Sequence, residues 1–84
     1  MHFNNDIDLY TTIGKNIKYY REQAKLTQIQ LAEQAEISIS YLSKIEASGC
    51  KKSISLSVLN QIANVLNISI SDFFKEVILN DTNS

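Results

Sequence analysis

"TQIQLAEQAEISISYLSKIE", residues 27–46, contains two short apolar stripes at helical spacing, separated by a few turn residues. The stripes are Leu31, Ala32 and Ala35, then Tyr41, Leu42 and Ile45. Thr27 can cap the first helix, with Gln30 completing a capping box, and Ser38 can cap the second. The stretch therefore predicts two helices, at about Gln28 to Ala35 and at about Ile39 to Ala47.

The tetrapeptide "ISIS" occurs at Ile37 to Ser40 and again at Ile68 to Ser71, with the related "SISLSV" at Ser53 to Val58. Such alternation is typical of a half-buried strand. Each copy, however, precedes apolar residues spaced as in a helix, and serine hydroxyls cap helices by accepting a hydrogen bond from the first turn. We therefore interpret three serines as helix starts: Ser38, Ser55 and Ser69.

The helical periodicity continues on both sides of residues 27–46. Upstream, one stripe is formed by Ile13, Ile17, Tyr20 and Ala24. The sequence thus predicts a compact all-α fold of five helices. Besides the two helices within residues 27–47, these are at about Thr11 to Lys25, Leu56 to Leu66 and Ile70 to Leu79. Residues 1–10 and 80–84 are expected to be loose ends of a single domain at residues 11–79.

Two short helices joined by a turn of about three or four residues form a helix-turn-helix unit. In such a unit the second helix enters the major groove of DNA. The close crossing of the helices needs a small residue, which Ala32 supplies, and the turn falls at Glu36 to Ser38. The spacing therefore favours a DNA-binding domain.

Composition restricts the class of protein. The chain has 84 residues, 44% of them hydrophobic, and we expect one small globular domain without a membrane span. Its first residues lack a secretory signal, so a cytoplasmic location is expected. The single Cys50 and the single His2 argue against a metal site, and no nucleophile constellation is present. Neither an enzyme nor a cofactor is expected.

The net charge is −1, but the positive charge is concentrated in the middle of the chain. Residues 13–56 contain seven basic and four acidic side chains. Segregated positive charge permits a nucleic-acid face on an acidic protein. Ordinary solvated lysines would give the same count, so charge alone leaves both interpretations open.

Four consecutive segments carry a resemblance to a known family: "IGKNIKYYRE", "LTQIQLAEQA", "ISISYLSKIE" and "LSVLNQIANVLNISISDFF". In their order and spacing, over about Ile13 to Phe74, the chain resembles the Xre/Cro-like phage-repressor type of helix-turn-helix regulators. The resemblance implies a lambda-repressor-like domain that binds double-stranded DNA. It also implies a dimeric repressor that reads a palindromic operator through helix 39–47. Glu36 and Lys25 depart from the family, which often has glycine at these positions.

The resemblance also implies residue roles. Ser40 and Lys44 share the outward face of the reading helix and are expected to contact bases or phosphates. Ile39 either packs on a thymine methyl group or belongs to the turn core, and Tyr41 either contacts a phosphate or packs partly inward. The expected DNA-binding residues are Gln28, Ser38, Ile39, Ser40, Tyr41, Ser43, Lys44, Lys51 and Lys52.

Two further sets of residues follow from the resemblance. Arg21 and Glu46 match positions that pair across the domain, and a bidentate guanidinium contact is expected between them. The last predicted helix carries more apolar surface than one core stripe needs, so part of it is expected to form a dimer interface. The alternative is that all of this surface closes the monomer core. The interface residues are Phe73, Phe74, Val77 and Ile78.

A second class of function uses the same fold as a protein-interaction module, such as an antitoxin or an antagonist of another regulator. The acidic outer helices favour a regulatory protein partner more than they favour DNA. Three lysines near the reading helix favour DNA instead: Lys44, Lys51 and Lys52.

Overall fold

The computed structural model describes residues 3, 5–47 and 54–76. These residues form four α-helices and one short 3-10 helix, η1. They are α1 (Asp6–Gln23), α2 (Gln28–Ala35), α3 (Ile39–Glu46), α4 (Leu56–Leu66) and η1 (Ile70–Phe74). Within the described ranges there is no strand, and no helix has the length and apolar character needed to cross a membrane. The prediction of an all-α fold is confirmed.

The serine and threonine caps lie where the sequence predicts them. The Thr27 hydroxyl accepts the backbone N–H of Gln30 at 3.1 Å, and the Gln30 side chain accepts the N–H of Thr27 at 2.8 Å. Ser38 and Ser55 each accept an N–H from the first turn of α3 and α4, at 3.0 and 3.1 Å. Ser69 caps η1 in the same way. The "ISIS" segments are therefore helix entries, and the strand interpretation is excluded for these residues.

The first helix begins earlier than predicted. The Asn5 side chain accepts the N–H of Asp8 at 2.9 Å and so caps a helix that starts at Asp6. Two carboxylates in the first turn favour this start, because the helix N-terminus carries partial positive charge. Leu9 and Tyr10 then pack against the core. The expectation of a loose segment through residue 10 is wrong from Asp6 onward. It placed the start of the helix close to its first apolar stripe and overlooked the Asn5 cap.

The last predicted helix is shorter and of a different type. The 3-10 helix η1 ends at Phe74, and Lys75 is already extended at φ −85° and ψ 152°. The predicted helix from Ile70 to Leu79 is therefore wrong at Lys75 and Glu76. Residues 77–84, which include Val77 and Ile78 of the expected dimer interface, lie outside the described residues.

Phe73 belongs to the monomer core. Its side chain is 0% exposed and meets the Tyr20 ring edge-on, with ring centroids 6.4 Å apart. The buried side chain of Asn16 donates hydrogen bonds to the carbonyl oxygens of Phe73 and Lys75, at 2.8 and 2.6 Å. These contacts hold η1 against α1, so the assignment of Phe73 to a dimer interface is wrong. Phe74 is half-buried.

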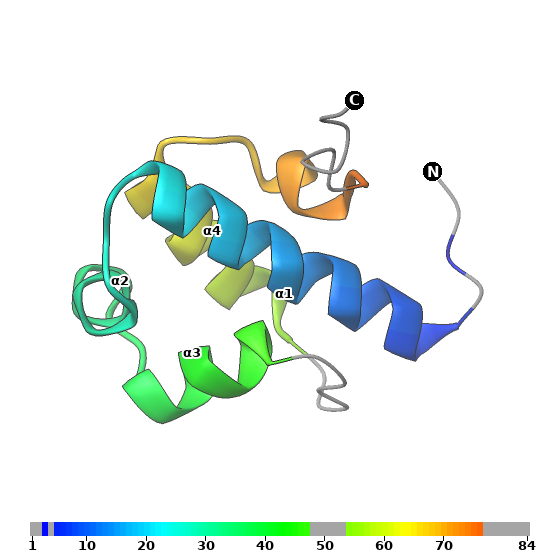
Figure 1. Ribbon diagram of the computed structural model, residues 1–84, viewed down its shortest axis with the longest axis horizontal. Coiled ribbons are helices and arrows are strands. Elements are labelled where there is room, and N and C mark those ends of the chain that lie inside the picture. The colour runs from blue at the N-terminus through cyan, green and yellow to red at the C-terminus, as the bar shows by residue number, and fades with distance from the viewer. Residues whose placement is uncertain (1–2, 4, 48–53, 77–84) are drawn as a thin grey trace.

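The hydrophobic core lies between α1 and the other elements. In Figure 1, α1 crosses the molecule with α3 below it and η1 above it, and it packs against both. The core residues are Ile13, Ile17, Leu31, Ala32, Ala35, Leu42, Ile45, Leu59, Ile62, Ala63, Leu66 and Phe73. Ala24 is exposed and lies beyond the last turn of α1, so it does not extend the predicted stripe.

Among the residues that the structure describes, three that are not glycine adopt the left-handed backbone region: Lys25, Glu36 and Asn67. Glu36 ends α2 at φ 60° and ψ 42°, and its N–H bonds back to carbonyls of the last turn. Lys25 has φ 61° just after α1. Both positions are those where the family often has glycine. A side chain in this region costs about 1 kcal/mol relative to glycine.

Candidate nucleic-acid interface

The orientation of α3 depends on a close approach to α1. A methyl group placed on Gly14 would overlap the carbonyl oxygen of Ile45 and would lie 3.3 Å from the carbonyl carbon. Only a residue without a β-carbon therefore permits this crossing. Sequence reasoning missed Gly14, although a lone glycine inside a helical stripe often marks a packing requirement.

The crossing of α2 and α3 uses small residues and a tight turn. Ala32 is 2% exposed, and its carbonyl oxygen accepts the N–H of Ile37 at 3.0 Å. From α3, the buried side chains of Leu42 and Ile45 face the core. The inward face predicted for this helix is thus the observed one. Two helices fix the position of α3 and leave its other face free of core packing.

The outward face of α3 exposes several side chains expected to bind DNA. Ser40, Ser43 and Lys44 are all exposed. Ile39 is 42% exposed, so it does not belong to the turn core. Tyr41 is half-buried and packs against the core, which is the second of its two predicted roles. Lys51 and Lys52 lie outside the described residues.

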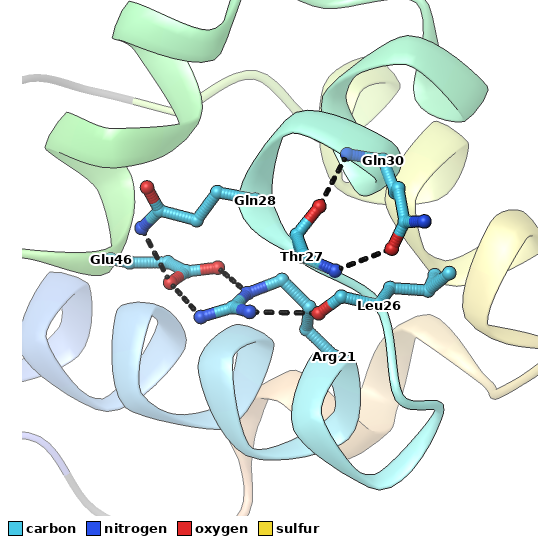
Figure 2. Close-up of polar contacts among 6 residues, drawn as sticks. All are labelled: Arg21, Leu26, Thr27, Gln28, Gln30 and Glu46. Atoms are coloured by element: carbon cyan, nitrogen blue, oxygen red, sulfur yellow. Dashed lines mark hydrogen bonds and ion pairs between the residues drawn. The ribbon is translucent and has the colours of Figure 1, made fainter.

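Arg21 and Glu46 form a bidentate ion pair between α1 and α3 (Figure 2). Arg21 Nε donates to Glu46 Oε2 at 2.8 Å, and Nη2 donates to Oε1 at 3.0 Å. The third guanidinium nitrogen, Nη1, donates to the carbonyl oxygen of Leu26 at 2.9 Å. Side-chain exposure is 10% for Arg21 and 3% for Glu46. The hydrogen bonding that Arg21 donates to the Glu46 carboxylate is the main cause that raises the pKa of Arg21 above its usual value.

Gln28 joins this pair from the start of α2. Its Nε2 donates to Glu46 Oε1 at 3.0 Å, so three helices meet at one carboxylate (Figure 2). The sequence indicated Gln28 as a DNA contact but not as a partner of Glu46. No local sequence pattern could predict the contact between Gln28 and Glu46. The two residues are 18 positions apart and meet only because α2 and α3 cross.

A second cross-helix contact was not foreseen. Gln61 Nε2 on α4 donates to the carbonyl oxygen of Ala35 at 2.8 Å. The last carbonyl groups of a helix have no partner within it, so this bond satisfies one of them at the end of α2. It ties α4 to the helix-turn-helix unit close to the turn. The unit is therefore braced by both α1 and α4.

Residues 17–73 match the sequence model of the protein family described as Helix-turn-helix. Among curated proteins, the immunity repressor protein of Bacillus phage phi105 is 47% identical over 60 residues. That alignment covers 71% of this chain but only 40% of the phage protein. The chain thus spans less than half the length of that relative.

Among solved structures, SinR, named as the master regulator for biofilm formation, in complex with DNA superposes with a TM-score of 0.70 at 33% identity. This match covers 75% of the present chain and 98% of that one. A complex of the SinR and SinI proteins gives a TM-score of 0.70 at 34% identity, covering 76% of this chain and 61% of that one. These relatives are a repressor and a regulator, not enzymes, as the sequence led us to expect. Since the matched model spans most of the chain and includes both crossing helices, the protein belongs to the Xre/Cro-like helix-turn-helix family.

Proposed function

We propose that this protein is a sequence-specific DNA-binding transcriptional regulator that places α3 in the major groove. The observation that carries the proposal is the outward face of α3, where Ser40, Ser43 and Lys44 are exposed while Leu42 and Ile45 anchor the helix. A helix held in this way can present side chains to base edges with little loss of freedom. The likeness to SinR, solved with DNA, and to a phage immunity repressor supports the same role.

The residue roles follow from the chemistry of each side chain. Lys44 donates to guanine O6 and N7 or to a phosphate, Ser40 and Ser43 bond base edges or backbone oxygens, and Ile39 packs on a thymine methyl group. Gln28 donates to a phosphate at the start of α2. Further contacts with the DNA backbone come from Ser38, Lys51 and Lys52.

The regulator acts as a homodimeric repressor on a palindromic operator, since two-fold protein symmetry matches two half-sites. Phe74, which is half-buried, contributes to the dimer contact together with Val77 and Ile78. Sedimentation equilibrium over a range of concentrations tests this part of the proposal. A protein that stays monomeric at the highest concentration would contradict the proposed homodimer. It would leave the proposal of DNA binding to be tested separately.

A protein partner is the second candidate function, and the solved complex of SinR with SinI favours it. The surface of α2 that points away from the core carries Glu33 and Gln34, and Glu36 follows at its C-cap; all three are exposed. Acidic side chains on this surface suit a basic protein better than they suit DNA. Binding of such a partner would regulate the protein.

Fluorescence anisotropy with DNA from upstream of the protein's own gene decides between the two. We expect tight binding that resists unrelated competitor DNA and weakens as salt is raised, because phosphate contacts release counterions. A variant with Lys44→Ala serves as the internal control for the α3 face. Equal affinity for specific and competitor DNA at every salt concentration would reject the regulator and favour the protein-interaction module.

A further inference from the structure

The Glu46 carboxylate accepts three hydrogen bonds, from two other helices. It accepts Nε and Nη2 of Arg21 and Nε2 of Gln28, at 2.8, 3.0 and 3.0 Å. Its side chain is only 3% exposed. A buried carboxylate needs this degree of compensation, because an unpaired charge in a poorly hydrated site is strongly unfavourable.

The contact with Glu46 determines which way the Gln28 amide points. An ionised carboxylate can only accept hydrogen bonds, so it attracts the NH₂ group of the amide and repels the oxygen. With one Nε2–H directed at Glu46, the second Nε2–H and Oε1 are the groups of the amide that do not contact Glu46. A free glutamine would sample both amide orientations. In this protein, Glu46 selects one of them.

We propose that Glu46 is a positioning residue that aims the second Nε2–H of Gln28 at a DNA phosphate, an inference that rests on the proposed DNA-binding function. Arg21 is the necessary third member. If Arg21 carried no positive charge, the negative charge of Glu46 would repel the phosphate that Gln28 binds. The bidentate geometry keeps the charges of Arg21 and Glu46 together, so the surface near Gln28 remains compatible with a polyanion.

A purely structural role for the Gln28–Glu46 contact makes a different prediction. In that case Gln28 only satisfies a lone pair of Glu46, and the two residues affect DNA affinity independently. In the positioning role the effect of Glu46 on DNA affinity passes through Gln28. A double-mutant cycle separates these cases, because it measures the dependence of one substitution on the other.

The cycle uses Glu46→Asp, Gln28→Ala and the double variant, with the dissociation constant for operator DNA measured by anisotropy at one salt concentration. Glu46→Asp keeps the negative charge but shortens the side chain, which withdraws the carboxylate from both Gln28 and Arg21. The cycle isolates the part of the effect that passes through Gln28. We expect it to weaken binding about fivefold in the parent and less than about twofold in the Gln28→Ala background. The matched control is Glu33→Asp on the exposed surface of α2, which should leave affinity unchanged.

Equal losses from Glu46→Asp in both backgrounds would overturn the inference, as would a Gln28→Ala variant that binds DNA like the parent. The thermal midpoint of each variant shows that it is folded at the assay temperature. If Glu46→Asp is not, Glu46→Gln replaces it in the same cycle, because it keeps the side-chain length and removes the charge that selects the amide orientation. A parent protein that binds no DNA would instead reject the proposed function itself, so the two failures are distinct.

Discussion

Gly14 of α1 and Ile45 of α3 approach so closely that the carbonyl oxygen of Ile45 occupies the space of a β-carbon on Gly14. This relationship sets how near α3 can lie to α1. Gly14 lies two turns from Arg21 along the same side of α1, where the ion pair with Glu46 holds the end of α3. Steric contact and charge pairing therefore act together on the helix that we propose to read DNA.

Gly14→Ala should destabilise the fold. Alanine normally favours a helix interior over glycine by about 0.5–1 kcal/mol. Here the added methyl group forces the α1 and α3 backbones apart, and we expect a net loss of about 2 kcal/mol, as for an overpacked core. Thermal unfolding should show a midpoint lower by about 8–16 °C. The neighbouring exposed Lys15→Ala is the control, and an unchanged or higher midpoint for Gly14→Ala would contradict the crossing described above.

Glu46→Ala should also destabilise the fold, for an electrostatic reason. It leaves the guanidinium group of Arg21, whose side chain is 10% exposed, without its carboxylate. Removing one member of a buried ion pair costs about 3 kcal/mol or more. Glu33→Ala, at an exposed position of α2, should cost far less. If the thermal midpoint of Glu46→Ala equals that of the parent, the pair contributes nothing to stability.

Glu36→Gly should stabilise the protein. The backbone of Glu36 is left-handed at φ 60°, which glycine adopts without steric cost. We expect a gain of about 0.5–1 kcal/mol in the free energy of unfolding, measured with a chemical denaturant. Gln34→Gly provides the matched control on the same helix, because its backbone is helical and glycine there should cost about 1 kcal/mol. A loss at position 36 would show that the Glu36 side chain makes a compensating contact.

Lys44→Ala and Gln28→Ala should weaken DNA binding in distinguishable ways. If Lys44 neutralises a phosphate, its loss reduces the slope of log affinity against log salt by about 0.9. Gln28 is uncharged, so Gln28→Ala should lower affinity while leaving that slope unchanged. Lys75→Ala is the charge-matched control, since η1 and α3 lie on opposite sides of α1 (Figure 1). A slope changed equally by Lys44→Ala and Lys75→Ala would indicate only a general effect of net charge.

The stability of η1 should depend on pH through Asp72. A hydrogen bond from Lys75 is the main cause that lowers the pKa of the Asp72 carboxyl, and that carboxylate also accepts the N–H of Ser69 at 3.2 Å. A lowered folded-state pKa stabilises the fold above the unfolded pKa, about 4, and the effect is lost as pH falls through the lower folded value.

Asp72→Asn should therefore lower the thermal midpoint at neutral pH and lose this effect in acid, where the parent carboxyl is protonated as well. Ser69→Ala removes an uncharged cap and should lower the midpoint by a similar amount at both pH values. A difference between Asp72→Asn and the parent that persists unchanged in acid would show that charge on Asp72 is not involved.

Features that depend on neighbouring residues could be predicted from the sequence. The capping box of Thr27 and Gln30, the caps Ser38 and Ser55, and the turn that begins at Glu36 each depend on groups only a few residues apart. The apolar stripes likewise predicted which face of each helix is buried. The early start of α1 was equally local, since the Asn5 cap is only three residues from Asp8, but the absence of an apolar stripe before Leu9 concealed it.

Contacts between distant residues were decided only by the tertiary structure. Asn16 reaches the carbonyl oxygens of Phe73 and Lys75 across 57 and 59 positions, and this contact accompanies the end of η1 and the burial of Phe73. The Gln28 contact with Glu46 and the need for Gly14 arise in the same way. The sequence by itself determined where helices begin, which faces are apolar and which family the chain resembles. How the helices cross was determined by packing, because a crossing angle depends on the shapes of two surfaces that no local pattern contains.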